Sequence, residues 1–168
     1  YQSVRHNNDL DNGKAILSKF PIKQAESIPF KLSIGDRLKA MWSTFKASKG
    51  SLFERAANTV SLWQKRTILR ATVQIAGKLV DVLDVHLTTG ASGNAAKQYK
   101  ELEAYVQARK ALGHDVLLAG DFNTRHDQAP GDAPDLRGWA SLQRHLTDAY
   151  AARPVTIRGL DGIDRSPA

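Results

Sequence analysis

The chain has 168 residues, a formal net charge of +7 and no cysteine. This length suits one domain, residues 1–168, with a sizeable core, and a hydrophobic content of 42% argues against disorder. The lack of cysteine excludes disulfides, thiolate zinc sites and a cysteine nucleophile. No apolar run approaches the ~20 residues that cross a bilayer, and residues 1–6 lack the apolar stretch of a signal peptide. The compartment stays open, because a chain without an initial Met is expected to be a fragment.

The positive charge is concentrated in one segment. Between Lys31 and Arg70 there are nine basic residues and two acidic ones, so this basic segment carries the whole net charge. Such a segment indicates an anionic partner, either nucleic acid or an anionic membrane surface. Nothing in the sequence identifies a protein partner, and we expect a monomer.

The first elements expected along the chain are a strand and a helix. Residues 14–18 predict a short apolar strand, which ends before Pro21. Apolar residues recur at helical spacing over residues 33–49 and predict a helix there. The residues of its apolar face are Ile34, Leu38, Met41, Trp42 and Phe45.

A β-hairpin is expected next. Residues 67–75 and 79–87 predict two consecutive antiparallel strands, which a short turn at 76–78 joins. The second strand is apolar nearly throughout, as a buried central strand would be.

The second half of the chain adds helices to this sheet. A helix is predicted over 94–112, with Gly113 at its end, and a buried strand over 115–119. Residues 128–136 predict a loop, and residues 138–146 a short helix. Strand pairs mixed with helices indicate α/β layers, in which helices cover a mixed or antiparallel sheet.

Asp121 and Asn123 are the first candidates for chemistry. They follow the apolar strand within Gly120-Asp121-Phe122-Asn123. A hard cation such as Mg²⁺ prefers oxygen ligands, which a carboxylate supplies, and residues two apart in an extended segment point the same way. Asn123 can therefore hydrogen-bond a nucleophilic water or a phosphate oxygen near Asp121. Taken alone, Gly, Asp and Asn are ordinary turn formers, and a turn is the commoner explanation.

Further polar residues are weaker candidates when each is taken alone. His86 ends the second hairpin strand and can donate a hydrogen bond or a proton to a phosphate oxygen. Arg70 can bind phosphate bidentately, and Asp164 can orient an imidazole. The ordinary alternatives are a strand-end His, a surface Arg and a loop Asp. Asp84 shares the strand parity of His86 whereas Asp81 faces the other way, and we interpret both as structural hydrogen-bonding groups.

Four segments, in order, resemble motifs of the endonuclease/exonuclease/phosphatase superfamily. Residues 13–22, GKAILSKFPI, are similar to its "G-x-A-I-L-S-R-F-P-I" segment, and residues 84–88, DVHLT, to its "T-H-L" strand end. Residues 117–124, LLAGDFNT, closely resemble its "GDFN" motif, and residues 163–165, IDR, its "I-D-Y/R-I" segment. Each segment is a weak signal alone, but four in order over most of the chain identify it as a member of that superfamily.

The resemblance implies a fold, a chemistry and a set of roles. The fold is a four-layered α/β sandwich of the deoxyribonuclease I-like type, and the chemistry is Mg²⁺-assisted attack of water on a phosphoester, with Mn²⁺ or Ca²⁺ as alternative cofactors. By resemblance, Asp121 holds the metal and activates or positions the water, and Asn123 helps to orient it. His86 is similar to a phosphate-contacting His, Asp164 to the Asp that orients the catalytic His, and Arg70 to a phosphate-binding Arg.

Two parts of the superfamily pattern are missing. Neither the N-terminal Asn nor the metal-binding Glu is found before the "AILSRFP" segment, and the closing "S-D-H" motif is absent. We therefore expect the chain to be truncated at both ends and its fold to be incomplete. A chain with only these site residues is expected to show weak catalysis or none, because removing members of a cooperative site costs orders of magnitude in rate.

Three functions remain open from the sequence. The favoured one is a metal-dependent endonuclease that hydrolyses nucleic-acid phosphodiester bonds, with the basic segment following the phosphate backbone. The alternatives are a sphingomyelinase-like phospholipid phosphodiesterase, whose basic helix lies on an anionic membrane, and a catalytically incomplete nucleic-acid-binding fragment. The pI near 9.8 and the Asp164-Arg165 pair favour the nuclease.

Overall fold

The computed structural model describes most of the regular elements of the chain. The described residues are 2–7, 13–31, 66–88, 94–124, 134–149, 157–158 and 164–165, with the single residues 35, 38, 42 and 51. For residues 2–7, 134, 157–158 and 164–165 the backbone alone is described.

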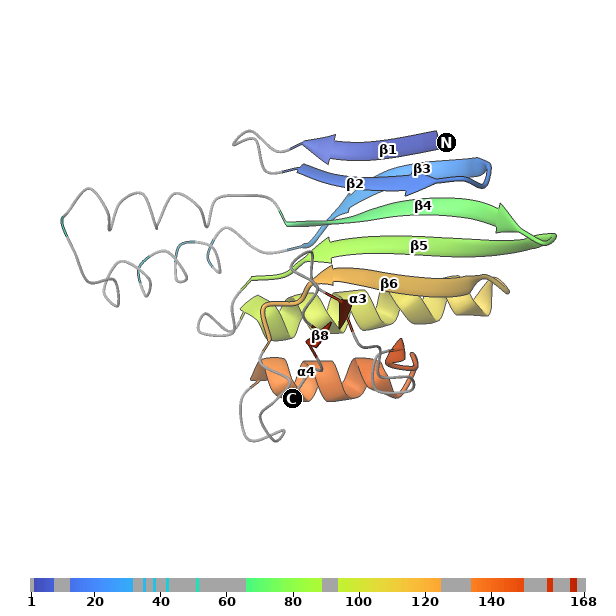
Figure 1. Cartoon of the computed structure of the whole chain (residues 1–168). Helices are drawn as coiled ribbons and strands as arrows, with labels where there is room; N and C mark the ends of the chain where they lie inside the picture. Colours follow the sequence, from blue (N-terminus) through green and yellow to red (C-terminus); the bar gives the residue numbers. More distant parts are fainter. Residues whose placement is uncertain are drawn as a thin grey trace.

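The described strands form two sheets and one short ribbon (Figure 1). β1 (Gln2–Asn7) and β2 (Gly13–Ser18) make an antiparallel two-stranded sheet. The larger sheet has the order β3-β4-β5-β6, and its strands are Ile22–Pro29, Thr67–Ile75, Lys78–His86 and Asp115–Asp121. The β3–β4 and β4–β5 pairs are antiparallel, whereas β5 and β6 are parallel. The ribbon consists of β7 (Ile157–Arg158) and β8 (Asp164–Arg165).

The β4–β5 hairpin follows from its turn and from the apolar strands on either side. Ala76 and Gly77 both have positive φ angles, 49° and 83°. Two central residues with positive φ form the turn whose twist matches that of two antiparallel strands. The predicted hairpin is confirmed, with β5 beginning and ending one residue before the predicted bounds.

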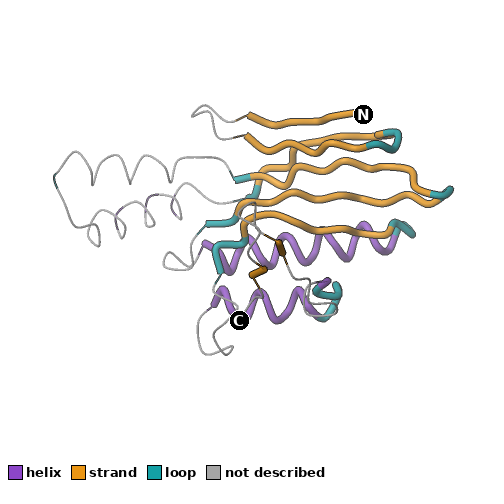
Figure 2. Tube along the Cα trace, in the orientation of Figure 1, coloured by secondary structure: helices purple, strands orange, loops and turns teal. Residues whose placement is uncertain are grey.

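Two helices cover one face of the larger sheet. They are α3 (Asn94–Ala111) and α4 (Pro134–Gln143), and Figure 2 shows them running alongside each other. Side chains from both helices pack with side chains of β4 and β5 in the larger of the two apolar clusters. Leu83, Leu102 and Val106 in this cluster are fully buried. Burial of each such side chain contributes about 1.5–3 kcal/mol, so this layer contact is a major source of stability.

β2 packs against the opposite face of the larger sheet. A second buried cluster contains Ile16 and Leu69, and Val82 packs beside it. Since successive residues of a strand point to opposite faces, Asp84 and His86 share the face of Val82. The described residues therefore form three layers, which are helices, the larger sheet and the smaller sheet.

The helix α3 connects the two parallel strands. A parallel pair cannot be joined by a tight hairpin and needs a crossover, which α3 supplies. Gly113 follows the helix with a φ of 81°, the left-handed conformation that ends many helices. The helix predicted over 94–112 is thus confirmed, and β5 and β6 end at the same edge of the sheet.

Other predicted elements need correction or lie elsewhere. The predicted loop over 128–136 is wrong at its end, because α4 begins at Pro134. Proline is favoured in the first turn of a helix, where its missing N–H has no partner to lose. The helix predicted over 33–49 lies outside the described residues except for single positions. No described helix combines the length and the apolar character needed to cross a membrane.

Candidate active site

His86 and Asp121 meet at the shared end of β5 and β6. The parallel register pairs them directly, and His86 Nε2 lies 3.7 Å from Asp121 Oδ2. The pairing continues beyond the strands, because the N–H of Leu87 donates to the carbonyl oxygen of Asp121 at 2.9 Å. The two side chains are 40% and 62% exposed, so both are accessible to a ligand.

The residues around Asp121 form a tight turn with unusual backbone angles. Gly120 has a φ of 134° and Asn123 a φ of 50°. The Asn123 N–H donates to Asp121 Oδ1 at 2.8 Å, and its Nδ2 donates to the carbonyl oxygen of Leu87 at 2.8 Å. The turn thus holds the Asp121 carboxylate in place and ties Asn123 to the end of β5. With Nδ2 engaged, the Asn123 amide oxygen is the atom left for a cation or a water.

Side chains of α3 hydrogen-bond the segments that follow both strands. The Thr88 N–H, just after β5, donates to Gln98 Oε1 at 2.8 Å. The hydroxyls of Tyr99 and Thr124 are hydrogen-bonded at 2.8 Å. Consecutive residues of one helix therefore hold the segments that follow His86 and Asn123.

Two cationic side chains that the sequence did not single out, Arg66 and Lys14, belong to this edge. Burial lowers the pKa of Arg66, and the nearby carboxylate of Asp121 partly offsets that effect. Burial also lowers the pKa of His86, in the same direction as the charges of Arg66 and Lys14, while Asp121 opposes them. The balance of these effects favours the neutral form of the His86 imidazole. The signal that points to Arg66 is its place directly before β4, at the sheet edge where β5 ends.

Asp81 and Asp84 lie on opposite faces of β5. Burial raises the pKa of Asp84, and Lys14 opposes this shift. Asp81 is fully buried on the helix side, where Arg109 Nε donates to it at 2.6 Å and His114 Nδ1 lies at 2.9 Å. The interpretation of Asp81 as a structural group agrees with these contacts, whereas Asp84 faces the candidate site with His86.

Arg70 is not brought to the other candidate residues. It pairs across the sheet with Leu83, which faces the helices, and it is 4% exposed. Its Nε lies 3.0 Å from Glu26 Oε1 and its Nη1 lies 3.5 Å from Asp81 Oδ1. The guanidinium is therefore committed to a buried ion-pair cluster on the face opposite His86. We correct the expected substrate-binding group accordingly and place Arg66 in the candidate site instead.

Two expected parts of the site, the Asp164 side chain and a metal-binding cluster, are not found among the described side chains. Asp164 lies in β8, for which only the backbone is described, so its side chain lies outside the described part. Among the described residues, no three His, Asp or Glu side chains gather as a metal-binding group. The described oxygen donors at the end of β6 are Asp121 and Asn123, and Asp84 of β5 lies on the same face.

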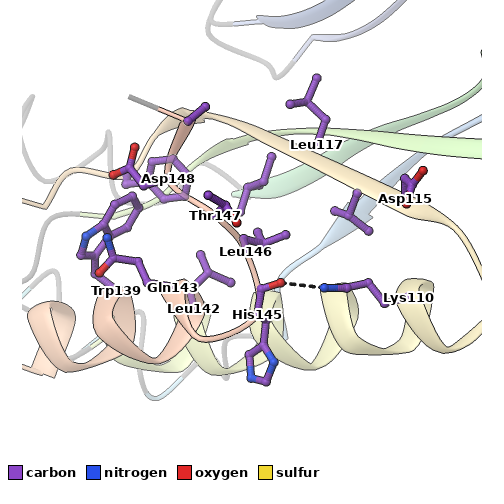
Figure 3. A pocket seen from close by; sticks show the side chains of 14 residues that line it. Lys110, Asp115, Leu117, Trp139, Leu142, Gln143, His145, Leu146, Thr147 and Asp148 are labelled. Atoms are coloured by element: carbon purple, nitrogen blue, oxygen red, sulfur yellow. Dashed lines mark hydrogen bonds between the residues drawn. The ribbon is translucent and has the colours of Figure 1, made fainter. Parts of the chain in front are cut away.

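One described cavity lies apart from these residues. It has a volume of about 570 Å³ and lies between β6 and the end of α4. Figure 3 shows Leu117, Trp139 and Leu146 around it, and Lys110 Nζ donating to the carbonyl oxygen of His145. Neither His86 nor Asp121 is among its lining residues, so the cavity is distinct from the candidate site.

The sequence matches one protein family model. The model of the endonuclease/exonuclease/phosphatase family matches residues 1–162. The search among curated proteins gave no match.

Several solved structures share the fold. Truncated TDP2 from Caenorhabditis elegans has a TM-score of 0.52 at 19% identity, over 77% of this chain and 43% of that one. TDP2 from the same organism has a TM-score of 0.51 at 18% identity, over 77% of this chain and 33% of that one. Sphingomyelinase C from Streptomyces griseocarneus has a TM-score of 0.49 at 18% identity, over 78% and 37%. The chain thus has a deoxyribonuclease I-like α/β fold. The match covers less than half of each of these solved chains.

Proposed function

Since the chain belongs to the endonuclease/exonuclease/phosphatase family, we propose that it forms part of a metal-dependent phosphodiesterase that acts on nucleic acid. The observation that carries the proposal is the pairing of His86 with Asp121, 3.7 Å apart at the end of two parallel strands. Arg66 precedes β4 at the same edge, where its positive charge lowers the pKa of His86 and interacts with the carboxylate of Asp121. We further propose that residues 1–168 fold as one monomeric domain.

The donor set at this edge suits a hard cation. The carboxylate of Asp121 and the amide oxygen of Asn123 are oxygen ligands, which Mg²⁺ prefers. Magnesium sites on enzymes commonly use one or two carboxylates and complete their shell with water and substrate phosphate. A bound Mg²⁺ would neutralise charge on the phosphate and favour ionisation of a water. Mn²⁺ and Ca²⁺ are the alternative ions for the same oxygens.

The side chains at this edge have separate proposed roles. The imidazole of His86 can donate a hydrogen bond to a non-bridging phosphate oxygen, and the guanidinium of Arg66 can bind the negative charge that the phosphate carries throughout the reaction. Asp121 is positioned to orient an attacking water, with Asn123 beside it. For Asp164 we propose, as the resemblance implies, that it orients the imidazole of the family's catalytic His.

Asp121→Ala tests this assignment against a matched carboxylate. Asp115 lies at the other end of the same strand and is exposed. With Mg²⁺ and bis(p-nitrophenyl) phosphate, we expect Asp121→Ala to lower the hydrolysis rate by about 10³-fold or more, as for other members of cooperative sites. Asp115→Ala is expected to hydrolyse like the wild type. Hydrolysis that survives Asp121→Ala would show that the site is elsewhere.

The substrate class is tested by binding. The basic segment, with its net charge of +7, favours nucleic acid, and binding should weaken steeply with salt if several phosphates are contacted. We expect the full chain to bind plasmid DNA, to cleave it weakly, and not to co-sediment with liposomes of sphingomyelin and phosphatidylserine. Liposome binding without DNA affinity would favour a phospholipid phosphodiesterase. DNA binding without any hydrolysis would favour a non-catalytic fragment.

A further inference from the structure

Lys14 connects the two sheets at the edge where the candidate site lies. It is a half-buried residue of β2, and its ammonium donates to the carbonyl oxygen of Thr67 and to Thr67 Oγ1, the latter at 2.9 Å. Lys14 and Thr67 belong to different sheets. Lys14 also shares the strand parity of Ile16, which packs between the sheets. Its side chain is therefore directed into the layer between β2 and the larger sheet.

The surroundings of this ammonium do not favour a charge. Burial lowers the pKa of Lys14 to about 8, Arg66 acts in the same direction, and Asp84 opposes them. An apolar side chain would avoid the loss of hydration that a buried charge suffers. Two cations held near each other raise the free energy further. Such unfavourable charge placement is more typical of functional sites than of packing.

Thr67 occupies a position that matters for the site. It is the first residue of β4, and the pairing of Ile68 with Val85 places it next to His86 across the sheet. The residue before it is Arg66, whose carbonyl oxygen accepts a hydrogen bond from the Phe30 N–H at 3.0 Å. The start of β4 is thus held by its neighbour within the sheet and by Lys14 from the other sheet.

We propose that Lys14 is a positioning residue of this site, which holds Thr67 and thereby sets the place from which Arg66 reaches the phosphate. Lys14 acts through Thr67 and does not touch the substrate. Without the ammonium, the start of β4 loses its link to the smaller sheet, and Arg66 samples more orientations. The inference rests on the proposed function, because it assigns a phosphate to the space beside Arg66.

The first test needs no substrate. The full chain is compared as wild type, Lys14→Met and Lys23→Met, the last being a control at an exposed lysine of β3. Solvent exchange of the Arg66 Nε proton, measured by NMR, should be faster in Lys14→Met and unchanged in Lys23→Met. A wild-type chain that hydrolyses no phosphodiester would contradict the proposed function alone, since this measurement reads the free protein.

The second test separates positioning from general damage. With bis(p-nitrophenyl) phosphate and Mg²⁺, Lys14→Met should raise KM by about tenfold and change kcat by less than about twofold, because misplacement of one phosphate-binding group weakens binding. Lys14→Arg, which keeps a cation, should recover most of the affinity. A folded Lys14→Met chain with wild-type Arg66 exchange and wild-type KM would overturn the proposal.

A second variant, Thr67→Val, keeps the proposal testable if Lys14→Met does not fold. Thr67→Val removes the hydroxyl acceptor and keeps the branched shape at a buried strand position. It should speed Arg66 exchange in the same direction as Lys14→Met, to a smaller extent, because the carbonyl acceptor of Thr67 remains. Unchanged Arg66 exchange in a folded Thr67→Val chain would equally overturn the proposal.

Discussion

Replacing Gly120 by alanine probes the contact that places Asp121 beside His86. A Cβ atom at Gly120 would lie 2.0 Å from the Val85 carbonyl oxygen and 2.8 Å from the Val85 nitrogen. These are backbone atoms of the neighbouring strand, so no side chain can rotate away. To reach even 3.0 Å, β5 and β6 must separate by about 1 Å next to the His86–Asp121 pair.

Two costs add in this variant. The backbone at Gly120, with φ at 134°, is strained for any residue with a side chain, at about 1–2 kcal/mol. The collision with β5 is a form of overpacking, which costs about 1–3 kcal/mol. The free energy of unfolding should therefore fall by about 2–5 kcal/mol. A 1 Å displacement of catalytic groups lowers rates by about 10²-fold, so hydrolysis should fall by a similar factor.

Gly113→Ala is the matched control. Gly113 also has a positive φ, 81°, but no atom lies within 4 Å of the added Cβ. Urea unfolding of both variants therefore isolates the collision, and Gly120→Ala should be less stable than Gly113→Ala by about 1–3 kcal/mol. Equal stabilities, or full hydrolytic activity in Gly120→Ala, would refute the argument that this glycine sets the strand spacing at the site.

Three further predictions concern residues that support the sheets. Burial lowers the pKa of Lys14 from 10.5 to about 8 in the folded chain, so between these pH values the unfolded chain keeps the proton and the folded chain does not. The free energy of unfolding of the wild type, relative to that of Lys14→Met, should therefore rise from pH 8 to 10 in urea titrations. A difference that stays constant with pH would contradict this prediction. Asp81→Asn should destabilise the fold by about 3–5 kcal/mol in the same assay, because it leaves the Arg109 charge without its partner. Tyr99→Phe removes the hydrogen bond to Thr124 and should cost about 1 kcal/mol, seen as a lower thermal midpoint, whereas an unchanged midpoint would show that the bond is dispensable.

The sequence predicted the buried part of the fold better than its edges. The hairpin and α3 were predictable because their apolar patterns reflect burial. β6 was predictable as a strand, but the expectation that it is buried is wrong, because it lies at the sheet edge and its residues are exposed or half-buried. β3 was not, because as an edge strand its residues are mostly exposed, and its sequence, IKQAESIP, lacks a clear alternation. The start of α4 was placed too late, at Gly138. A Cβ there would lie 2.6 Å from the Tyr99 Cβ, so glycine is needed inside this helix for close contact with α3.

The candidate site was predictable only in part, for a geometric reason. His86 and Asp121 end two strands joined by a crossover helix, and that pattern alone predicts that they meet. Strand alternation alone could not show that Arg66, and not Arg70, lies at the candidate site. Strand parity would give both arginines the same face, but Arg66 precedes β4, where the alternation no longer holds. Lys14 was hidden because its partner Thr67 comes from a different sheet.

The buried carboxylate of Asp81 has a consequence for the site on the other side of the sheet. A slip of β5 by one residue would turn every side chain to the opposite face, which would bury His86 beneath the helices and expose Asp81 to the smaller sheet. Only the observed alignment lets Asp81 meet Arg109 of α3 and the nearby His114. A misaligned strand would leave the largely buried charge of Arg109 without its counter-ion. The ion cluster therefore selects the alignment in which the functional face of β5 points away from the helices.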